Sequence, residues 1–508
     1  MIFGRPHAFF ATVNPVVFTA SSIVVLTFVL FGVIFTDTAS LTFAAIHGFI
    51  TEYLGWIYIL AVTVFLAFLL WLALSPYGRI RLGNTEDRPE FSFMAWFSLL
   101  FGAGMGIGLI FWSVAEPMLH YQNPPFGEGE TQEAASEAMA FTFFHWGLHA
   151  WAVYVVLGLS VAYFSFRKGL PLTIRSIFYP MLGDRIYGPI GHVIDILAVF
   201  GTLFGLATSL GFGAMQLNTG LNVLFGMPIS GWFQVGIIGA ITFVAVMAVI
   251  SGLDRGLKWM SLANLWLATA LLLFVLLAGP TLFIIRFFLD SIGEYLNHIV
   301  QLSLTAGAMQ EAEWQKSWTI FYWAWWIAWS PFVGIFIARV SRGRTIREFI
   351  AGVLLLPSLF VFVWLAVFGG TALHFELFGD GAGIAAAVAE DTTIALYATL
   401  EQLPLFHLAS GLATVLIATY FITSSGSGTH VIDALVSRGS TRSPKRQRVI
   451  WGITEGAVAA TLLIVGGEMA LDGLQTGAIT AGLPVAIILL FACVNLTRAL
   501  QGETAAPY

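Results

Sequence analysis

Charge and cysteine are both scarce in this chain. Asp, Glu, Lys and Arg make up 10% of its 508 residues, and Cys493 is its single cysteine. A soluble domain carries roughly 25% charged residues. One cysteine excludes an internal disulfide and offers no cysteine motif for redox or metal chemistry. The low charge, together with 58% hydrophobic residues, excludes a water-soluble globule.

Long apolar runs take the place of charge. Crossing a hydrocarbon core about 30 Å thick takes about 20 helical residues, and the chain has twelve such runs, too long and unbroken for barrel strands. Spanning segments must satisfy their backbone hydrogen bonds internally, so we predict an all-α polytopic membrane protein with twelve transmembrane helices. The runs cover residues 14–35, 53–74, 91–119, 138–165, 190–223, 230–251, 259–288, 315–341, 347–373, 407–437, 447–467 and 476–498.

Basic residues fall almost entirely in alternate loops. Of the 22 Lys and Arg residues, 20 lie in even-numbered loops or at the two chain ends, and only Arg286 and Lys316 lie elsewhere. The opposite loops are acidic, as at Glu128, Glu376 and Asp391. By the positive-inside rule we expect both termini to be cytoplasmic. Basic residues spread in this way determine topology and give no indication of a nucleic-acid partner.

The sequence has no segment typical of a soluble domain. The first apolar run is too long for the core of a signal peptide, so we take it as the first span. Residues 291–304 repeat apolar side chains at helical spacing between two predicted spans. This segment indicates an amphipathic helix on the outer surface of the membrane.

Five tryptophans fall within twelve residues of the eighth predicted span: Trp318, Trp323, Trp325, Trp326 and Trp329. Ring faces attract cations, most strongly where water is excluded, so the run indicates a site that handles something cationic. A bulky packing helix or an interfacial aromatic belt is the alternative, although a belt places only one or two tryptophans at a helix end.

Glycine is concentrated in the third predicted span. Residues 101–108 are FGAGMGIG, with glycines at alternate positions. Each glycine costs a helix interior about 1 kcal/mol relative to alanine, so four of them favour an unwound turn whose backbone faces a cavity. Their spacing of four also fits close helix–helix packing, and at this point the two interpretations stay open.

The fourth predicted span combines aromatic residues with two histidines. On a continuous helix, Trp146, Trp151 and Tyr154 lie within about 140° of one another and could form a wall of a cation box. His145 and His149 lie four residues apart, a spacing compatible with a metal. Because a metal site needs a third and usually a fourth ligand, we expect hydrogen-bonded packing histidines instead.

Hydroxyl groups and acids also occur within the predicted spans. Thr423 and Ser424 in the tenth span either bond back to the helix backbone or offer oxygen ligands to a small cation. Glu116, Asp195 and Glu455 are candidates for proton relay because acids in membrane spans are costly. For Glu116, near the outer end of its span, a structural role is at least as well supported.

Three motifs resemble the betaine/choline/carnitine transporter family. They are Gly104-Met-Gly-Ile-Gly108, the Trp146, Trp151 and Tyr154 set, and the run from Trp323 to Phe332 that is followed by Arg339-Val-Ser-Arg-Gly-Arg344. The resemblance extends from about residue 85 to 495. It implies a transporter of the bacterial inner membrane and not an enzyme. It also implies a homotrimer and a LeuT-like fold, in which two leading helices precede a 5+5 inverted repeat.

The implied organisation divides the chain into consecutive parts, with the substrate site where the third and eighth spans meet. Residues 1–85 would hold the two leading helices and 86–289 the first repeat. Residues 290–314 would form the periplasmic amphipathic helix, 315–500 the second repeat and 501–508 a short cytoplasmic tail.

The resemblance implies a substrate site made of two groups of residues. Aromatic side chains would enclose an onium head group, with Trp329 on the inward path, and the glycine-rich stretch would face a carboxylate. The implied substrate-binding positions are Trp146, Trp151, Tyr154, Trp325, Trp326, Trp329, Met105, Gly106 and Gly108.

The resemblance also implies sodium as the coupling ion and no organic cofactor. Sodium-independent carnitine exchangers of the family carry an arginine in the seventh span, whereas residues 259–285 contain no charge. The positions of a second sodium site match at Thr202 and Phe332 but not at Leu206, which offers no oxygen in place of an expected threonine. The implied ligands of the first sodium are Gly102, Met105, Tyr420, Thr423 and Ser424.

The uncharged Gly108 bears on the choice of substrate. Choline carriers of the family tend to have an acid at this position, where it would repel a carboxylate. We therefore expect sodium symport of glycine betaine across the lipid bilayer by alternating access. Dimethylsulfoniopropionate, carnitine, choline and sodium-independent exchange remain alternatives, because a sulfonium presents nearly the same cation to an aromatic box.

Overall fold

The computed structural model describes residues 12–104, 106–250, 254–308, 312–379, 381–440 and 443–504. These residues form helices and short connections, with one isolated β-bridge between Arg81 and Thr345. Within the described ranges, eleven helices or continuous helical runs are long and apolar enough to cross a membrane. The prediction of an all-helical, multi-pass membrane protein is therefore confirmed.

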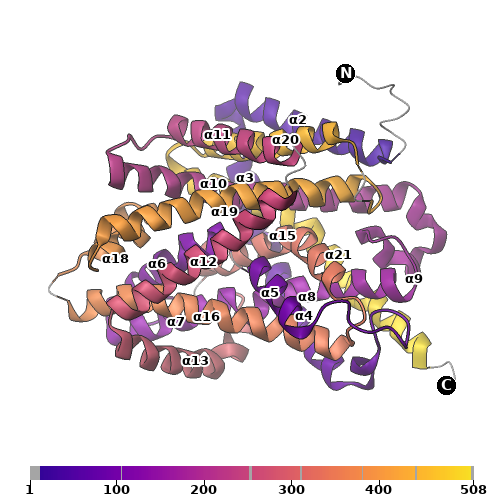
Figure 1. Ribbon diagram of the computed structural model, residues 1–508, viewed down its shortest axis with the longest axis horizontal. Helices are drawn as coiled ribbons and strands as arrows, with labels where there is room; N and C mark the ends of the chain where they lie inside the picture. Colours follow the sequence, from indigo (N-terminus) through magenta and orange to yellow (C-terminus); the bar gives the residue numbers. More distant parts are fainter. Residues whose placement is uncertain are drawn as a thin grey trace.

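The long helices overlap the predicted spans (Figure 1), except that residues 36–49, which lie between the first two predicted spans, are also helical. Four of the described α-helices are short, with seven residues or fewer: α9 (Tyr179–Leu182), α14 (Ala312–Ser317), α17 (Ile384–Glu390) and α18 (Ala395–Glu401). The long helices are α2 (Pro15–Ile34), α3 (Thr36–Phe49), α4 (Gly55–Leu74), α7 (Gln132–Trp146), α8 (Leu148–Ala162), α10 (Pro189–Phe225), α11 (Gly231–Ile250), α12 (Asp254–Ala278), α15 (Thr319–Val340), α16 (Ile346–Phe378), α19 (Phe406–Val436), α20 (Lys445–Gly466) and α21 (Ala470–Thr504).

The predicted span at 91–119 is interrupted. It consists of α5 (Phe93–Gly104) and α6 (Ile107–Gln122), each shorter than the eleven long runs. Gly106 between them has an extended backbone, with φ −161° and ψ 176°. The glycine-rich stretch is thus unwound where the sequence had left unwinding and packing open. Because α5 and α6 are both short, neither is among the eleven long runs of the described residues, and the count of twelve spans stays a prediction.

The seventh predicted span ends earlier than expected. We had placed it at 259–288, but α12 ends at Ala278, and Gly279 and Pro280 separate it from α13 (Thr281–Leu304). Proline offers no backbone N–H to continue a helix, which explains the break. The predicted surface helix at 291–304 is therefore the second half of a longer helix. Because the first side chains of α13 are apolar, hydropathy extended the predicted seventh span into this helix.

The fourth predicted span is also broken, at Gly147. This residue joins α7 to α8 with φ −92° and ψ −130°. A Cβ here would lie 2.4 Å from the Phe362 ring of α16, so only glycine admits that ring. The single continuous helix assumed in the sequence analysis was wrong. Trp146 ends α7, whereas Trp151 and Tyr154 lie on α8.

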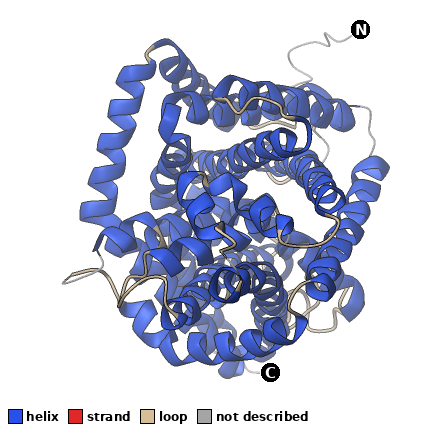
Figure 2. Cartoon of the chain, turned by 90° about the vertical axis from the view of Figure 1, so that its left-hand side faces the viewer, coloured by secondary structure: helices blue, strands red, loops and turns tan. Residues whose placement is uncertain are grey.

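The most buried helices form the centre of the molecule. In the most apolar 18-residue segment of the helical run through α7 and α8, 94% of the residues are buried. In the corresponding segments of α2 and α12 the share is 22%. In the view of Figure 2, helices seen nearly end-on in the middle of the molecule have other helices around them. Small residues allow close contact there: a Cβ on Gly205 of α10 would lie 2.9 Å from the backbone nitrogen of Trp329 in α15. The broken spans and the tryptophan-rich helix therefore meet in the core.

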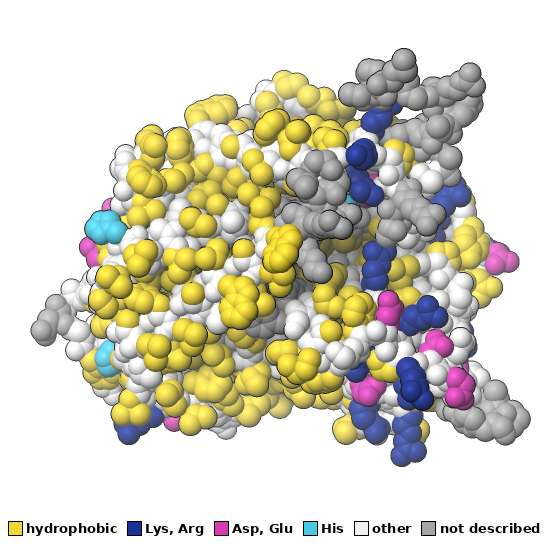
Figure 3. All heavy atoms as spheres, in the orientation of Figure 1, with side chains coloured by type: hydrophobic (Ala, Val, Ile, Leu, Met, Phe, Trp, Pro, Cys, Tyr) yellow, Lys and Arg dark blue, Asp and Glu magenta, His cyan; other side chains and the backbone are white. Residues whose placement is uncertain are grey.

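Loops rich in basic residues gather at one end of the molecule. The backbones of Leu82 and Arg344, from different loops, are joined by a 2.8 Å hydrogen bond. Arg167 at the end of the α8 run pairs with Glu503 near the end of α21. Figure 3 shows Lys and Arg side chains concentrated at the right-hand end, while hydrophobic side chains cover much of the remaining face. This arrangement agrees with the loop assignment made from the sequence.

A buried ion pair secures part of this basic end. Asp195 of α10 is fully buried, and its carboxylate accepts a 2.6 Å hydrogen bond from Nε of Arg175. This contact gives the carboxyl group, a candidate for proton relay in the sequence, a structural partner. Removing one partner of a buried pair leaves an uncompensated charge, which costs about 3–5 kcal/mol.

We therefore expect Asp195→Asn to lower the thermal unfolding temperature of the purified protein in detergent by several degrees. The matched control is Glu313→Gln, which removes a partner of Lys316 at a side chain that is 88% exposed. Exposed pairs contribute roughly 0–1 kcal/mol, so this control should leave the temperature nearly unchanged. Equal shifts in the two variants would contradict the assigned role of Asp195.

Candidate functional site

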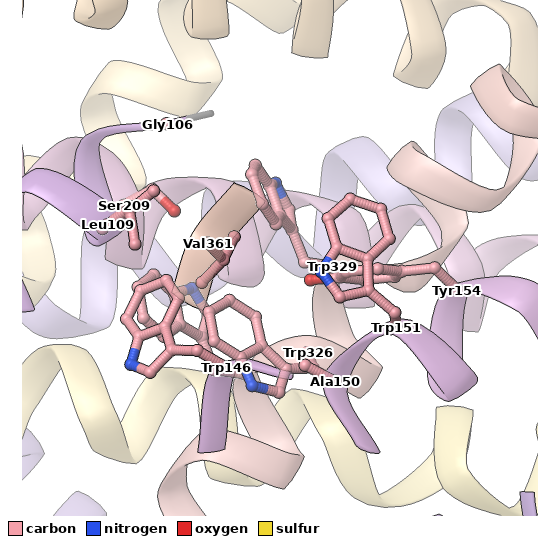
Figure 4. A pocket seen from close by; sticks show the side chains of 12 residues that line it. Gly106, Leu109, Trp146, Ala150, Trp151, Tyr154, Ser209, Trp326, Trp329 and Val361 are labelled. Carbon is pink, nitrogen blue, oxygen red and sulfur yellow. The ribbon is translucent and has the colours of Figure 1, made fainter. Parts of the chain in front are cut away.

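An aromatic cavity lies between the broken spans and α15 (Figure 4). Its free volume is about 30 Å³. Eight of the nine positions proposed for substrate binding line it, and the ninth, Met105, lies outside the described residues. The structure thus brings these positions together, although their role remains a prediction. The lining residues are Gly106, Gly108, Leu109, Trp146, Ala150, Trp151, Tyr154, Ser209, Trp325, Trp326, Trp329 and Val361.

The rings of the cavity meet one another closely. Trp325 and Trp326 are stacked, with ring centroids 4.6 Å apart, and Trp146 meets Trp326 edge to face at 4.8 Å. On the other side, Tyr154 and Trp151 are edge to face at 5.4 Å. Such offset and T-shaped contacts are the favoured arrangements of aromatic rings. The rings therefore hold each other in place around the cavity.

Three tryptophans of the cavity direct their polar edges into the surrounding protein. Trp326 donates from Nε1 to the carbonyl oxygen of His145 at 2.8 Å, and Trp325 donates to that of Gly205 at 3.2 Å. Trp146 donates to the carboxylate of Glu116 at 2.7 Å. Because these N–H groups are already bonded, the three indoles offer no free donor to the cavity, and their π systems are what remains to attract a cation.

Two polar atoms of the cavity wall have no protein partner among the described residues. They are Nε1 of Trp329 and the hydroxyl of Tyr154, and both are buried. A buried donor without a partner costs about 1–3 kcal/mol. A ligand with a carboxylate could accept from both groups, so the cavity combines ring faces for a cation with donors for an anion.

Gly108 lies directly against the tryptophan helix. A Cβ at this position would lie 2.3 Å from Cη2 of Trp325. Gly108 therefore permits the third and eighth spans to meet, so close packing holds here while unwinding holds at Gly106. The two interpretations that the sequence left open apply to neighbouring residues.

A buried carboxylate cluster lies behind Trp146, and the sequence analysis did not recognise it as a cluster. Glu116 accepts from the Trp146 indole and contacts Tyr322, His120 and His145. Glu116 and His120 lie four residues apart on α6, but His145 belongs to another predicted span, so spacing along the chain gave no signal for the whole cluster. Ligand atoms of Glu116, His120 and His145 lie within 4.8 Å of one another, a separation that would also suit a metal ion.

The two histidines considered together in the sequence serve different partners. His145 contacts Glu116 and Thr319, whereas His149 lies 2.7 Å from the hydroxyl of Ser303 in α13. Both are buried within the helix packing. The expectation of hydrogen-bonded packing histidines agrees with these contacts.

Comparison with known proteins identifies the type of molecule to which this cavity belongs. The profile described as BCCT, betaine/carnitine/choline family transporter, matches residues 16–505. The chain belongs to the betaine/carnitine/choline transporter family. Its relatives in this family are transporters and not enzymes.

Similar transporters cover almost the whole chain. The glycine betaine transporter OpuD of Bacillus subtilis (strain 168) is 48% identical over 94% of this chain and 92% of its own length. A probable glycine betaine transporter of Desulfitobacterium hafniense (strain Y51) is 46% identical over 96% of this chain and 98% of its own. The osmo-dependent choline transporter BetT2 of Acinetobacter baylyi is 40% identical over 96% of this chain and 72% of its own.

The hydroxyl of Thr423, a proposed sodium ligand of this family transporter, already has protein partners. It donates within α19, where the carbonyl oxygens of Thr419 and Tyr420 lie 3.0 and 3.1 Å away. It also accepts from Nδ2 of Asn264 in α12 at 3.2 Å. Asn264, which the sequence analysis missed, is buried, and its Oδ1 has no partner among the described residues.

The other proposed ion positions are placed as follows. Tyr420 is buried and Ser424 is half-buried on α19, while Gly102 lies in α5. Thr202 donates to the carbonyl oxygen of Ala198 in its own helix, and Phe332 stacks on the Trp329 ring with centroids 5.5 Å apart. No ion site is tested by these contacts, so both sodium sites remain predictions.

Gly108→Ala tests the contact between α6 and α15. The added methyl group would displace Trp325 from the cavity wall, and overpacking of this kind costs about 1–3 kcal/mol. We expect substrate affinity to fall by about tenfold or more in a binding assay on purified protein. The matched control is Gly239→Ala on α11, away from the cavity, where an added Cβ would meet no atom within 4 Å. A similar loss in both variants would contradict the assignment.

Proposed function

We propose that this transporter imports glycine betaine by sodium symport and alternating access across a bacterial inner membrane. The carrying observation is the buried cavity of aromatic faces, in which the N–H groups of Trp146, Trp325 and Trp326 are bonded elsewhere. A quaternary ammonium group is bound by such faces without hydrogen bonds. The names of the similar transporters from Desulfitobacterium and Bacillus support glycine betaine as the substrate.

The rest of the cavity wall supports a zwitterion over a simple cation. Among the described residues that line it, none carries a formal charge. The free donors of Trp329 and Tyr154 suit the carboxylate of glycine betaine, which choline lacks. In this proposal Trp146, Trp151, Trp325, Trp326 and the ring of Tyr154 enclose the ammonium group. The stretch of Met105, Gly106 and Gly108 and the donors of Trp329 and Tyr154 approach the carboxylate.

The size of the cavity supports a mechanism with moving parts. A free volume of about 30 Å³ holds no more than a few water molecules, so the rings must separate to admit a trimethylammonium group. The breaks at Gly106 and Gly147 adjoin the cavity and divide each of their spans into two segments. In our proposal these segments move relative to α15 and expose the site to each side of the membrane in turn.

The proposed architecture has twelve crossings, with the interrupted α5–α6 segment counted as one. Two leading helices occupy residues 1–85, and inverted repeats of five spans occupy 86–289 and 315–500 in a LeuT-like arrangement. The helix between them would lie on the periplasmic side. The basic end of the molecule would face the cytoplasm with both termini, and three copies would form a homotrimer.

Sodium is the proposed coupling ion. One ion would be held by Gly102, Met105, Tyr420, Thr423 and Ser424. A second ion at Thr202 and Phe332 is proposed with fewer ligands, because Leu206 offers no oxygen. The uncharged sequence at 259–285 supports an ion over a fixed cation in the seventh span. The unpartnered Oδ1 of Asn264 adds a hard oxygen next to Thr423, the kind of ligand that small cations prefer.

Uptake into proteoliposomes tests the proposed substrate and coupling. We expect an inward sodium gradient to drive accumulation of radiolabelled glycine betaine above its level without the gradient. Sodium-independent exchange would refute the coupling, and faster uptake of choline, carnitine or dimethylsulfoniopropionate would change the substrate. We expect Trp326→Leu to weaken glycine betaine affinity by about thirtyfold, since a desolvated cation–π contact contributes about 2 kcal/mol. The matched control, Trp232→Leu, removes a ring that is 77% exposed on α11 and should behave as wild type.

The ion site is tested by Thr423→Ala. Loss of one oxygen ligand should raise the sodium concentration for half-maximal uptake by roughly tenfold. Thr419→Ala, one turn earlier on α19, removes a hydroxyl that bonds only to carbonyl oxygens of its own helix in the contacts described, and it should leave the sodium dependence unchanged. An unchanged sodium dependence in the Thr423 variant would count against the assigned site.

A further inference from the structure

The Glu116 carboxylate is a buried acid that the transport proposal has not used. It lies on α6, is fully buried, accepts a hydrogen bond from the N–H edge of the Trp146 indole and does not line the cavity. Its bonding partners among the described residues include no Lys or Arg. Burying a charge without a cation is costly unless hydrogen-bond donors replace the lost water. The donors around Glu116 therefore decide what it does.

Four groups converge on the two carboxylate oxygens. Trp146 Nε1 and the Tyr322 hydroxyl lie 2.7 and 2.5 Å from Oε2. His145 Nδ1 and His120 Nε2 lie 2.7 and 3.3 Å from Oε1. The three shorter distances fall in the range of hydrogen bonds to an ionised carboxylate. The shell around Glu116 thus suits an anion.

The chemistry of two partners fixes the direction of their bonds. An indole nitrogen can only donate, so Trp146 donates to Oε2. His120 accepts from Trp314 at Nδ1, at 3.3 Å, so in its neutral form its proton is on Nε2 and it donates to Oε1. Each carboxylate oxygen therefore has one partner that must donate. The Thr319 hydroxyl lies 3.0 Å from His145 Nε2 and can donate a hydrogen bond to it. His145 then carries its proton on Nδ1 and donates to Glu116.

This carboxylate is connected to two walls of the cavity. It binds the Trp146 ring directly, and it contacts His145, whose backbone oxygen accepts from Trp326. A negative charge on the indole N–H increases electron density on the ring, and the ring face is what attracts a cation. The ring thus lies between the buried charge and the space where an onium head group would be held.

We propose that Glu116 is a positioning residue that acts through Trp146 as the counter-charge of the bound cation. It orients the ring by its N–H group and raises the preference of the cavity for a positively charged head group over an uncharged one of equal shape. This inference rests on the proposed binding of an onium substrate. In this inference Glu116 helps to select ligands by the charge of their head group, whereas the rings select them by shape and size.

A pair of ligands that differ only in charge tests this role. The nitrogen of glycine betaine is replaced by carbon in 3,3-dimethylbutanoate, which keeps the shape and the carboxylate but removes the positive charge. Competition of each against radiolabelled glycine betaine on purified protein gives a preference ratio. We expect Glu116→Gln to lower this ratio by about fivefold, because the neutral amide no longer polarises the Trp146 ring and about half of a desolvated cation–π contact of about 2 kcal/mol is lost. A variant that lowers both affinities equally would show a packing role and overturn the proposal.

The matched control is Glu455→Gln on α20. Glu455 is a second fully buried acid, held by the hydroxyls of Ser425 and Thr429, and it does not line the cavity. We expect its ratio to match the wild type, and an equal fall in both variants would contradict a specific role for Glu116. Trp146→Phe keeps a ring but removes the N–H donor, so it should also lower the ratio. Adding Glu116→Gln to it should then lower the ratio little further.

The outcomes separate this inference from the proposed function. If wild-type protein binds neither glycine betaine nor choline, the proposed substrate class is wrong. If wild-type protein binds glycine betaine but the ratio is the same in Glu116→Gln, only the role of Glu116 is wrong. If Glu116→Gln does not fold, the single Trp146→Phe variant decides: a ratio equal to wild type would overturn action through the indole N–H.

Discussion

The need to satisfy backbone hydrogen bonds inside a membrane governs this structure. An unpaired N–H or C=O group costs several kcal/mol in hydrocarbon, so spans are helical and may break only where protein surrounds them. The breaks at Gly106 and Gly147 both occur in the buried centre, beside the cavity. At Gly147 the N–H still donates to Phe143 and the carbonyl accepts from Trp151, so the chain bends without losing these bonds.

The polar atoms of the side chains around the cavity are also hydrogen-bonded within the protein in most cases. Tryptophan has one polar atom, and Trp146, Trp325 and Trp326 each satisfy it away from the cavity. The rings can therefore face a cation without leaving an unpaired donor behind them. At Trp146 the acceptor of the N–H group is the Glu116 carboxylate and not a carbonyl oxygen, so the same hydrogen bond also brings a negative charge to the ring. One contact would then both fix the orientation of the Trp146 ring and strengthen its attraction for a bound cation.

Several elements could be predicted because they depend on local composition. Hydropathy located α10, α11 and α20 to within two residues at every boundary. The boundary between α12 and α13 was missed because the side chains that follow Pro280 remain apolar, and hydropathy does not distinguish a lipid-facing helix from one that packs on the protein. The break at Gly147 was missed because a single glycine is compatible with a helix, and only the neighbouring Phe362 ring shows why glycine is required there.

The sequence by itself determined the class of molecule, the approximate positions of the spans and the residue types of the aromatic site. These follow from hydropathy, loop charge and the number of tryptophans, which need no knowledge of contacts. Only the tertiary structure decided which polar group each ring would bond, that Gly108 would touch Trp325, and that Glu116 would lie behind Trp146. Such contacts join different helices, and hydrogen bonds between them depend on distance and direction in space, which spacing along the chain does not specify.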